Sequence, residues 1–385
     1  MKTIKNNKGR ILICVNEFFG AWGTPYGGYG FVARHLLSNF LNKAKLNFDV
    51  CLGRSKNCSL KKYFFMDQYI TEEGVKLIRL PRVRALAANI VNSYDLIISI
   101  EATVDFVFSL KGRIKKPILF WIQDPRCKSD WEQIDSVQLA KEPVYWNDNT
   151  YKLVKECNSL GLIKFVTQAH FLSEKAKELY SLPNDTQIKF LPNPINVDWN
   201  LSDFSSTKEN TIIFLGRLDS VKRGWLFCEI AKNLPQYNFL VLGDSSDANE
   251  RSKNRILKNY YNLKNLHFLG RVTGKEKDKI LKKAKILVNT SIHEALPVSF
   301  LEAFSYGLCV VSNQNPDNLT DKYGIYIGQS LGDGFEDVDK FIQAIVLLLS
   351  NDKLFKDKSN AAYQYVSNVH SIDNFGKLFL NAVDM

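Results

Sequence analysis

Two glutamates separated by seven residues, Glu294 and Glu302, form the part of the sequence best suited to chemistry on a bound ligand. The apolar run Ile286–Val288 precedes them and predicts a buried strand. Pro297 suits the first turn of a helix, and Gly307 suits its C-terminal cap. The stretch therefore predicts a strand, a loop that carries Glu294, a helix that carries Glu302, and a further strand.

The start of this helix is a candidate anion site. Free backbone N–H groups at Val298 and Ser299 would face a ligand there, and the helix dipole favours negative charge. A phosphate could bind at this point, with one carboxylate on each side to hold hydroxyl groups. A capping Glu294 and a solvated Glu302 would fit the same pattern.

Basic residues follow the first strand of the second half of the chain. Thr211–Leu218 is an apolar run that includes Gly216-Arg217, and Lys222-Arg223-Gly224 then opens a helix. Two cations at one strand end can neutralise a diphosphate, Arg as a planar fork and Lys as a point charge. A merely solvated strand end is the alternative. The pattern also leaves open whether Lys222 or Arg223 would bind the ligand.

Two stretches of the first half also suggest a binding role. A glycine-rich loop that contains Gly27 and Gly28 separates the first strand from the first helix, although it starts too far after the strand for a dinucleotide fingerprint. The apolar run Ile118–Ile122 leads directly into Gln123, Asp124 and Arg126. Ligands bind beyond the C-terminal ends of strands in open α/β sheets, so these three residues are candidates for binding a sugar or an acceptor. A plain Asp-Pro turn is the alternative.

Taken together, these residues resemble the signature of the family-4 retaining glycosyltransferases. The string from His293 to Ala303 is similar to a common variant of that family's E-x7-E motif, with Ala295 where the family often has Gly. Gly216-Arg-Leu218 with Lys222 resembles its G-R-L-x-x-x-K-G element, with Arg223 inserted before Gly224. The resemblance is strong over residues 210–328 and only architectural over the first 195.

The resemblance implies roles for individual residues. Glu294 would orient the donor sugar and support an oxocarbenium-like transition state, and Glu302 would hold the ribose. Arg217 and Lys222 would stabilise the leaving diphosphate without a metal ion, and no other cofactor is expected. The remaining residues expected to contact the nucleotide-diphosphate sugar are Gly27, Gly28, Arg271, Val272, Leu296, Val298 and Ser299.

The same resemblance implies an α/β fold of the GT-B type, with two Rossmann-like doubly wound parallel-sheet domains. We expect an N-terminal acceptor domain over residues 1–195, on which a C-terminal helix at about 370–385 packs, and a C-terminal donor domain over residues 196–369. The prolines of Leu191-Pro-Asn-Pro194 mark the boundary between them. The chain length of 385 residues suits two domains.

Charge, cysteines and hydropathy limit the setting of the protein. Its net charge of +11 is uneven, because residues 1–195 hold 28 Lys and Arg against 18 Asp and Glu, whereas the remainder holds 23 against 22. This excess favours an anionic partner, either a lipid-linked or phosphorylated glycan acceptor or the inner face of an anionic membrane, and basic residues that serve only solubility are the alternative. The contacts would be a helix beginning near Arg82 and Arg84, for which simple packing on the sheet is the alternative, and the basic run Lys111–Lys116. Scattered cysteines favour packed thiols in a reducing cytoplasm, and no signal peptide or membrane span is predicted.

Two other functions fit parts of the sequence. A sugar-nucleotide epimerase of related fold would need His and Asp bases, which the sequence does not show. A nucleic-acid-binding protein would fit the pI of about 9.1, but no motif of that class is present and no nucleic acid is expected as a partner. No metal-ligand spacing appears among the five His residues. The sequence leaves the nucleobase, sugar, acceptor and linkage open, and it favours a role in cell-surface polysaccharide or glycoconjugate synthesis.

Overall fold

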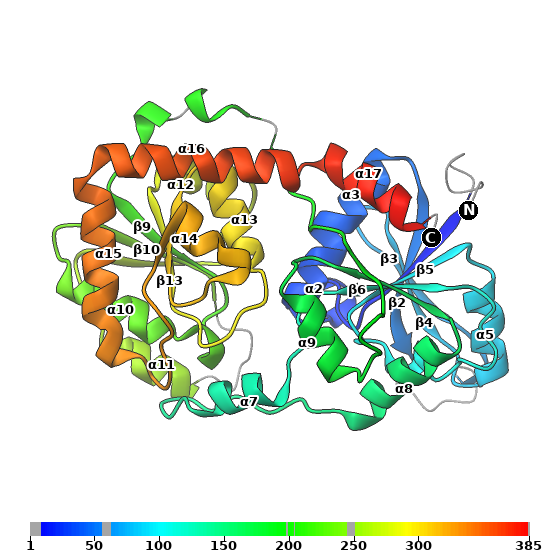
Figure 1. Cartoon of the computed structure of the whole chain (residues 1–385). Helices are drawn as coiled ribbons and strands as arrows, with labels where there is room; N and C mark the ends of the chain where they lie inside the picture. Colours follow the sequence, from blue (N-terminus) through cyan, green and yellow to red (C-terminus); the bar gives the residue numbers. More distant parts are fainter. Residues whose placement is uncertain (1–8, 56–62, 198, 204, 245–250, 384–385) are drawn as a thin grey trace. The chain divides into compact units, whose positions relative to one another are not determined.

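The computed structural model describes residues 9–55, 63–197, 199–203, 205–244 and 251–383, which fold as two compact units (Figure 1). Unit 1 comprises Met1–Pro125, Tyr145–Pro194 and Ile372–Met385. Unit 2 comprises Arg126–Val144 and Ile195–Ser371. The predicted N-terminal domain, residues 1–195, includes residues 126–144, but in the structure these belong to unit 2, because their side chains and backbone bond to loops of that unit.

Unit 1 is built on a sheet whose described residues form eight strands in the order β3-β4-β2-β1-β5-β6-β7-β8. All neighbouring strands are parallel except β3, which pairs antiparallel with β4 at the edge. Residues of the inner strands are buried on both faces, as expected where helices cover a parallel sheet. The strands are β1 (Arg10–Cys14), β2 (Asn47–Arg54), β3 (Asp67–Ile70), β4 (Lys76–Leu80), β5 (Leu96–Ile100), β6 (Ile118–Ile122), β7 (Ile163–Thr167) and β8 (Ile188–Phe190).

The first helical region of unit 1 differs from the single helix that its apolar spacing predicts. A π-helical segment, Val32–Leu37, lies between α2 (Gly28–Phe31) and α3 (Ser38–Lys43). The hydroxyl of Ser38 donates a 2.7 Å hydrogen bond to the Ala33 carbonyl, five residues back, which stabilises the wider turn. The other α-helices of unit 1 are α5 (Arg84–Asn92), α6 (Asp105–Phe108), α8 (Asp148–Ser159), α9 (Leu172–Leu179) and α17 (Ile372–Val383).

The C-terminal helix α17 packs on unit 1 through aromatic contacts. The ring of Phe375 lies 4.7 Å from that of Phe40 and 5.6 Å from that of Trp121, measured between centroids. Phe375 and Phe379 are fully buried. The hydrophobic face of α17 therefore completes the core of unit 1.

Unit 2 contains a wholly parallel sheet in the order β11-β10-β9-β12-β13-β14, six strands within the described residues. The strand order reverses between β9 and β12, and ligands of doubly wound sheets bind at this kind of switch point. The strands are β9 (Thr211–Leu215), β10 (Asn238–Leu242), β11 (Leu266–Gly270), β12 (Ile286–Asn289), β13 (Cys309–Ser312) and β14 (Gly324–Tyr326).

Eight α-helices of unit 2 lie within the described residues. In the described part of the chain, none of the helices of either unit has both the length and the apolar character needed to cross a membrane. Cys228 and Cys309 are buried free thiols, as the apolar runs around them predict. The α-helices are α7 (Lys128–Asp135), α10 (Gly224–Asn233), α11 (Arg251–Lys258), α12 (Gly274–Lys283), α13 (Val298–Ser305), α14 (Leu319–Tyr323), α15 (Val338–Ser350) and α16 (Asp352–Val369).

Candidate active site

The candidate site lies at the carboxyl ends of β9 and β12, the two strands at the switch point of unit 2. The loop after β9 carries Arg217 and Lys222, and the loop between β12 and α13 carries Glu294. The strands are parallel neighbours, with Ile212 beside Ile286, so both loops leave the same edge of the sheet. The topology thus gathers the acidic and basic residues that the sequence singles out.

Glu294 is held by three donors that converge on one carboxylate oxygen. Lys222 Nζ lies 2.5 Å from Glu294 Oε1, Ser291 Oγ lies 2.6 Å from it, and Asn289 Nδ2 lies 3.0 Å from it. The side chain of Glu294 is 8% exposed and that of Lys222 is 23% exposed. Among the described residues, no hydrogen bond to the second oxygen, Oε2, is present. The carboxylate is therefore fixed in direction and keeps an oxygen for a ligand.

The charge state of Glu294 follows from opposing effects. Burial acts to raise the pKa of its carboxyl, but the Lys222 ammonium and the hydrogen bonds from Lys222, Ser291 and Asn289 hold that pKa below its usual value. Glu294 is thus ionised at neutral pH in spite of its burial. A negative charge at this position can interact with developing positive charge on a bound substrate.

Lys222 and Arg223 are neighbours in sequence but have different surroundings. Arg223 is fully buried, and its guanidinium donates to the carbonyl oxygens of Thr290, at 2.7 Å, and of Gly332, at 3.1 Å. Its backbone lies in the left-handed region, with φ of 46°. Lys222 instead reaches Glu294 and is partly exposed. The structure therefore makes Lys222 the candidate ligand of a diphosphate and Arg223 a buried connection between two loops.

Arg217 remains accessible at the end of β9. Its guanidinium forms a 3.0 Å ion pair with Asp219, whose side chain is 4% exposed, while that of Arg217 is 43% exposed. The buried Asp219 carboxylate thus orients the Arg217 side chain and leaves donor groups of the guanidinium facing solvent. This geometry suits an Arg that binds an incoming anion.

The helix α13 begins one residue later than the sequence predicts, at Val298, with Pro297 as its N-cap. Leu296 is buried at the end of the preceding loop, whereas Val298 and Ser299 are half-buried. Gly307 has a φ of 66°, the left-handed conformation expected of a glycine after a helix end. The helix start is therefore positioned beside the loop that carries Glu294.

Glu302 does not share the contacts of Glu294. Lys277, on α12, lies 2.6 Å from Glu302 Oε1, and both side chains are slightly exposed, at 18% and 19%. At the end of β11, Gly270 has a φ of 66°, and after it Arg271 is exposed and Val272 is buried. The expected nucleoside contacts at these positions stay predictions.

Gly27 and Gly28 of unit 1, both predicted to contact the donor, differ in the space around their Cα atoms. A Cβ on Gly27 would lie 2.1 Å from the carboxylate oxygens of Glu17, so only glycine fits beside this buried acid. Glu17 in turn accepts a 2.8 Å hydrogen bond from the Gly30 N–H. Gly28 starts α2 and faces open space. The loop is therefore folded around Glu17, which the sequence analysis did not single out.

Gln123 is part of a buried amide network rather than an open surface. Its side chain is 3% exposed and exchanges two 3.2 Å hydrogen bonds with the Asn193 amide. The backbone N–H groups of Gln123 and Asp124 donate to Glu101 Oε2, at 2.7 and 2.9 Å. Arg126 lies over the ring of Trp131, 5.2 Å from its centroid. These contacts fold the turn after β6, and a sugar-binding role for its side chains stays a prediction.

Glu101, at the carboxyl end of β5, is an acid that the sequence analysis missed. It has a φ of 51° and accepts hydrogen bonds from the turn after β6 and from the Tyr180 hydroxyl. Burial raises the pKa of its carboxyl to about 7, although the hydrogen bonds from Tyr180, Gln123 and Asp124 oppose the shift. The signal that could have indicated Glu101 in the sequence is its position directly after a buried strand.

The site in unit 2 has the groups to bind an anion and, beside it, a ring that carries hydroxyl groups. Arg217 and Lys222 supply positive charge, and Glu294 supplies a fixed carboxylate. Within the residues that the structure describes, no cluster of His, Cys, Asp and Glu has the geometry of a metal site.

Comparison with known proteins finds a family match in the second half of the chain. Residues 201–365 match the family model described as glycosyl transferases group 1. One relative is a GalNAc-α-(1→4)-GalNAc-α-(1→3)-diNAcBac-PP-undecaprenol α-1,4-N-acetyl-D-galactosaminyltransferase of Campylobacter jejuni. The chain is 29% identical to it over 193 residues, a match that covers 46% of this chain and 49% of that protein. It is also 29% identical over 235 residues to a UDP-Gal:α-D-GlcNAc-diphosphoundecaprenol α-1,3-galactosyltransferase of Escherichia coli, covering 54% of this chain and 57% of that protein. The matches thus span about half the length of each relative.

A solved structure with the same fold covers nearly the whole chain. HepE of Anabaena, in complex with UDP, superposes with a TM-score of 0.70 at 11% identity and covers 97% of this chain and 99% of that one. At this identity the likeness shows the fold alone. Together with the two parallel sheets, it confirms the predicted GT-B fold.

Proposed function

We propose that this chain, whose residues 201–365 form a glycosyl transferases group 1 domain, is a retaining glycosyltransferase that uses a nucleotide-diphosphate sugar. The observation that carries the proposal is the Lys222–Glu294 pair at the switch point of unit 2, beside the start of α13. A cation, a fixed carboxylate and a helix N-terminus are the groups needed to bind a diphosphate and an adjoining sugar.

The proposed reaction breaks the bond between the anomeric carbon and the diphosphate oxygen. Arg217 and Lys222 stabilise the negative charge that develops on this leaving group. Glu294 interacts with the positive charge that develops on the sugar ring. The acceptor hydroxyl attacks from the face that the diphosphate leaves, so the configuration is retained, and its proton passes to the departing phosphate oxygen. No metal ion is required in this scheme.

A panel of nucleotide sugars tests the proposed activity. A transferase should slowly hydrolyse its correct donor in the absence of acceptor and release a nucleoside diphosphate. An epimerase of related fold would instead return an isomeric nucleotide sugar. Such a product, without net hydrolysis of any donor in the panel, would refute the transferase proposal.

Nucleotide binding without metal provides a separate prediction. A nucleoside diphosphate at a hundred times its Kd should stabilise the chain by roughly 2.7 kcal/mol, because it binds the folded state alone. Arg217→Ala should remove most of that stabilisation. Thermal unfolding is measured with UDP and GDP, in EDTA and then with Mg²⁺ or Mn²⁺. A shift that appears only with the metal would contradict the metal-free diphosphate site.

For the acceptor, we propose a glycan carried on an anionic lipid, with unit 1 in contact with an anionic membrane. Both curated relatives are named for acceptors on a diphosphate-linked undecaprenol. The excess of basic residues lies in the first 195 residues, whereas a donor diphosphate would be bound by the near-neutral half. A negatively charged acceptor or membrane accounts for this asymmetry.

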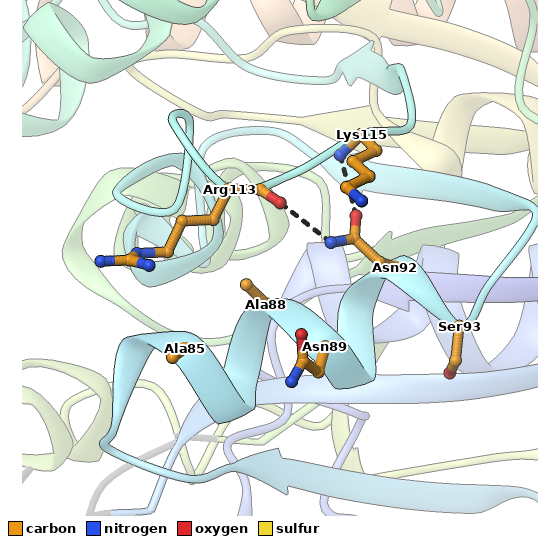
Figure 2. Close-up of a pocket in the computed structure, with 7 residues that line it drawn as sticks. All are labelled: Ala85, Ala88, Asn89, Asn92, Ser93, Arg113 and Lys115. Carbon is orange, nitrogen blue, oxygen red and sulfur yellow. Dashed lines mark hydrogen bonds between the residues drawn. The ribbon is translucent and has the colours of Figure 1, made fainter.

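The two basic segments predicted to make this contact border the same pocket in unit 1 (Figure 2). The pocket has a volume of about 320 Å³ and lies between α5 and the segment that carries Arg113 and Lys115. Asn92 joins its two sides, because its amide donates to the Arg113 carbonyl at 2.9 Å and accepts from the Lys115 N–H at 2.8 Å. Amides and cations at one opening suit a phosphate-bearing head group.

Exposed aromatic side chains adjoin the start of α5. The backbone N–H groups of Arg82 and Val83 donate to the Tyr63 carbonyl, and the Arg82 guanidinium lies 5.7 Å from the centroid of the Tyr63 ring. Phe64 and Phe65 follow, 48% and 65% exposed. Aromatic rings beside arginines are typical of surfaces that dock at a membrane interface.

Flotation with liposomes tests the membrane contact. The chain should float with anionic vesicles at low salt and much less at 1 M salt or with neutral vesicles, because charge attraction is screened. Replacing both Phe64 and Phe65 by Ser should reduce flotation. Leu160→Ser, at a residue that is 59% exposed in the loop before β7, is the matched control. If flotation does not depend on lipid charge or salt, the basic residues serve only solubility, and a neutral acceptor is favoured.

A further inference from the structure

Residues 126–144, here called the strap, belong to unit 2 although the residues on both sides of them in the sequence belong to unit 1. The strap contains one helix, α7, and otherwise little regular structure. Its attachment to unit 2 rests on polar contacts at three places, a buried His–Asp pair at one and hydrogen bonds at the other two. Two of these places are the loops that carry Lys222 and Glu294.

The first attachment joins α7 to the loop after β12. Asp130 Oδ1 lies 3.4 Å from His293 Nδ1, and both side chains are almost completely buried, at 7% and 4% exposure. The other oxygen of Asp130 accepts a 2.8 Å hydrogen bond from the Cys127 N–H and so caps α7. His293 directly precedes Glu294, so this contact restrains the backbone that aims the Glu294 carboxylate.

The second attachment joins the end of the strap to the loop after β9. The Ser220 hydroxyl donates a 2.6 Å hydrogen bond to Glu142 Oε2. Ser220 is buried and lies between Arg217 and Lys222 in the sequence. A hydrogen bond to an ionised carboxylate is stronger than one between neutral groups. Glu142 therefore fixes the middle of the loop whose two cations face the proposed diphosphate.

The third attachment joins the strap to the loop before α15. Asp333 Oδ1 accepts from the backbone N–H groups of Gln138 and Leu139, both at 3.0 Å. The Gly332 N–H donates to Ser136 Oγ at 2.9 Å. Arg223 bonds to the same loop and to Thr290. One connected set of hydrogen bonds thus links the strap with both charged loops.

We propose that the strap is a positioning element of the donor site, in which Asp130 and Glu142 hold the Glu294 and Lys222 loops in their binding geometry. Its effect on donor binding rests on the proposed function. The two loops have only short 3₁₀ structure of their own, so their conformation depends on contacts from outside. A carboxylate acceptor for Ser220 and a buried partner for His293 supply those contacts.

The experiment measures the affinity for UDP, or for GDP if that nucleotide gives the larger thermal stabilisation, in four variants of the Glu142–Ser220 hydrogen bond. Glu142→Ala and Ser220→Ala should each weaken binding roughly tenfold, the effect of one hydrogen bond to a charged group. The double variant should bind no more weakly than either single one, because the two changes remove the same bond. Glu142→Gln keeps an oxygen that accepts from Ser220 and should bind within twofold of the wild type.

Lys141→Ala is the matched control. Lys141 is next to Glu142 but pairs with Asp135 inside the strap, so its loss should leave affinity unchanged. Additive losses in the double variant, or a Glu142→Ala variant with wild-type affinity, would overturn the proposal.

Hydrogen exchange separates this proposal from the proposed function. In Glu142→Ala, amides of residues 216–223 should exchange faster, and in Asp130→Asn those of residues 290–296 should do so, while α8 in unit 1 stays unchanged. The exchange result does not depend on which nucleotide binds. If the wild type binds no nucleoside diphosphate yet the loops loosen, the strap positions the loops and the proposed function fails. Unchanged exchange in both loops would refute the positioning role.

Discussion

Replacing Glu294 by Gln is expected to lower kcat at least ~100-fold while the affinity for the nucleoside diphosphate changes little. The carboxylate accepts from Lys222, Ser291 and Asn289 through one oxygen, which Gln can partly reproduce. Gln cannot supply the negative charge that the Lys222 ammonium keeps on Glu294. If this charge acts mainly on the transition state, its loss appears in kcat.

Steady-state kinetics with the identified donor, together with thermal shifts by the nucleoside diphosphate, measure the two effects separately. Glu302→Ala is the informative comparison, because Glu302 pairs with Lys277 and is expected to hold the ribose. That variant should weaken nucleotide binding, and unchanged affinity would count against its assigned role. A Glu294→Gln enzyme with near-wild-type kcat would exclude Glu294 from the chemical step.

The strands that position this site could be predicted from the sequence because their information is local. β6 begins and ends at the predicted residues, Ile118 and Ile122, since it is an apolar run buried on both faces. The left-handed Gly307 after α13 was predictable for the same reason. By contrast, β3 is an exposed edge strand without apolar alternation, and β8 and β14 have only three residues each. Such elements form because a neighbouring strand is present, so their own residues carry a weak signal.

Long-range contacts explain most of what the sequence did not reveal about the site. Arg217 and Glu294 each follow a predicted strand, and the two strands are parallel neighbours. Both residues were therefore predictable at the same edge of the sheet. The pairing of His293 with Asp130 and of Ser220 with Glu142 depends on how residues 126–144 pack. Nothing near these positions in the sequence indicates a partner more than seventy residues away. The buried state of Arg223 is of the same kind, since residues 330–332 determine it.

The sequence leaves open whether Lys222 or Arg223 binds the diphosphate, and replacing each residue in turn should have a different effect. Lys222→Met should reduce kcat/KM roughly 100-fold, because it removes a cation from the proposed leaving group. It should leave most of the thermal stability, since Glu294 retains its bonds to Ser291 and Asn289.

Arg223→Met should instead act on folding. Burial lowers the pKa of the Arg223 guanidinium to about 10, and carboxylates led by Asp337 oppose that shift, so the side chain stays charged and bonded inside unit 2. Its removal leaves the carbonyl oxygens of Thr290 and Gly332 without their donor, which costs roughly 3 kcal/mol, or about 6–12 °C in Tm for a unit of this size.

Differential scanning calorimetry and donor kinetics on both variants distinguish the two residues. The loops at 290 and 332 that Arg223 joins are also those that hold Glu294 and the strap, so Arg223→Met should lose activity along with stability. Activity lost on heating should then follow the unfolding curve of this variant, whereas Lys222→Met should show its reduced kcat/KM while fully folded. If Arg223→Met is folded and inactive, and Lys222→Met is active, then Arg223 is the diphosphate ligand and its buried position must change when the donor binds.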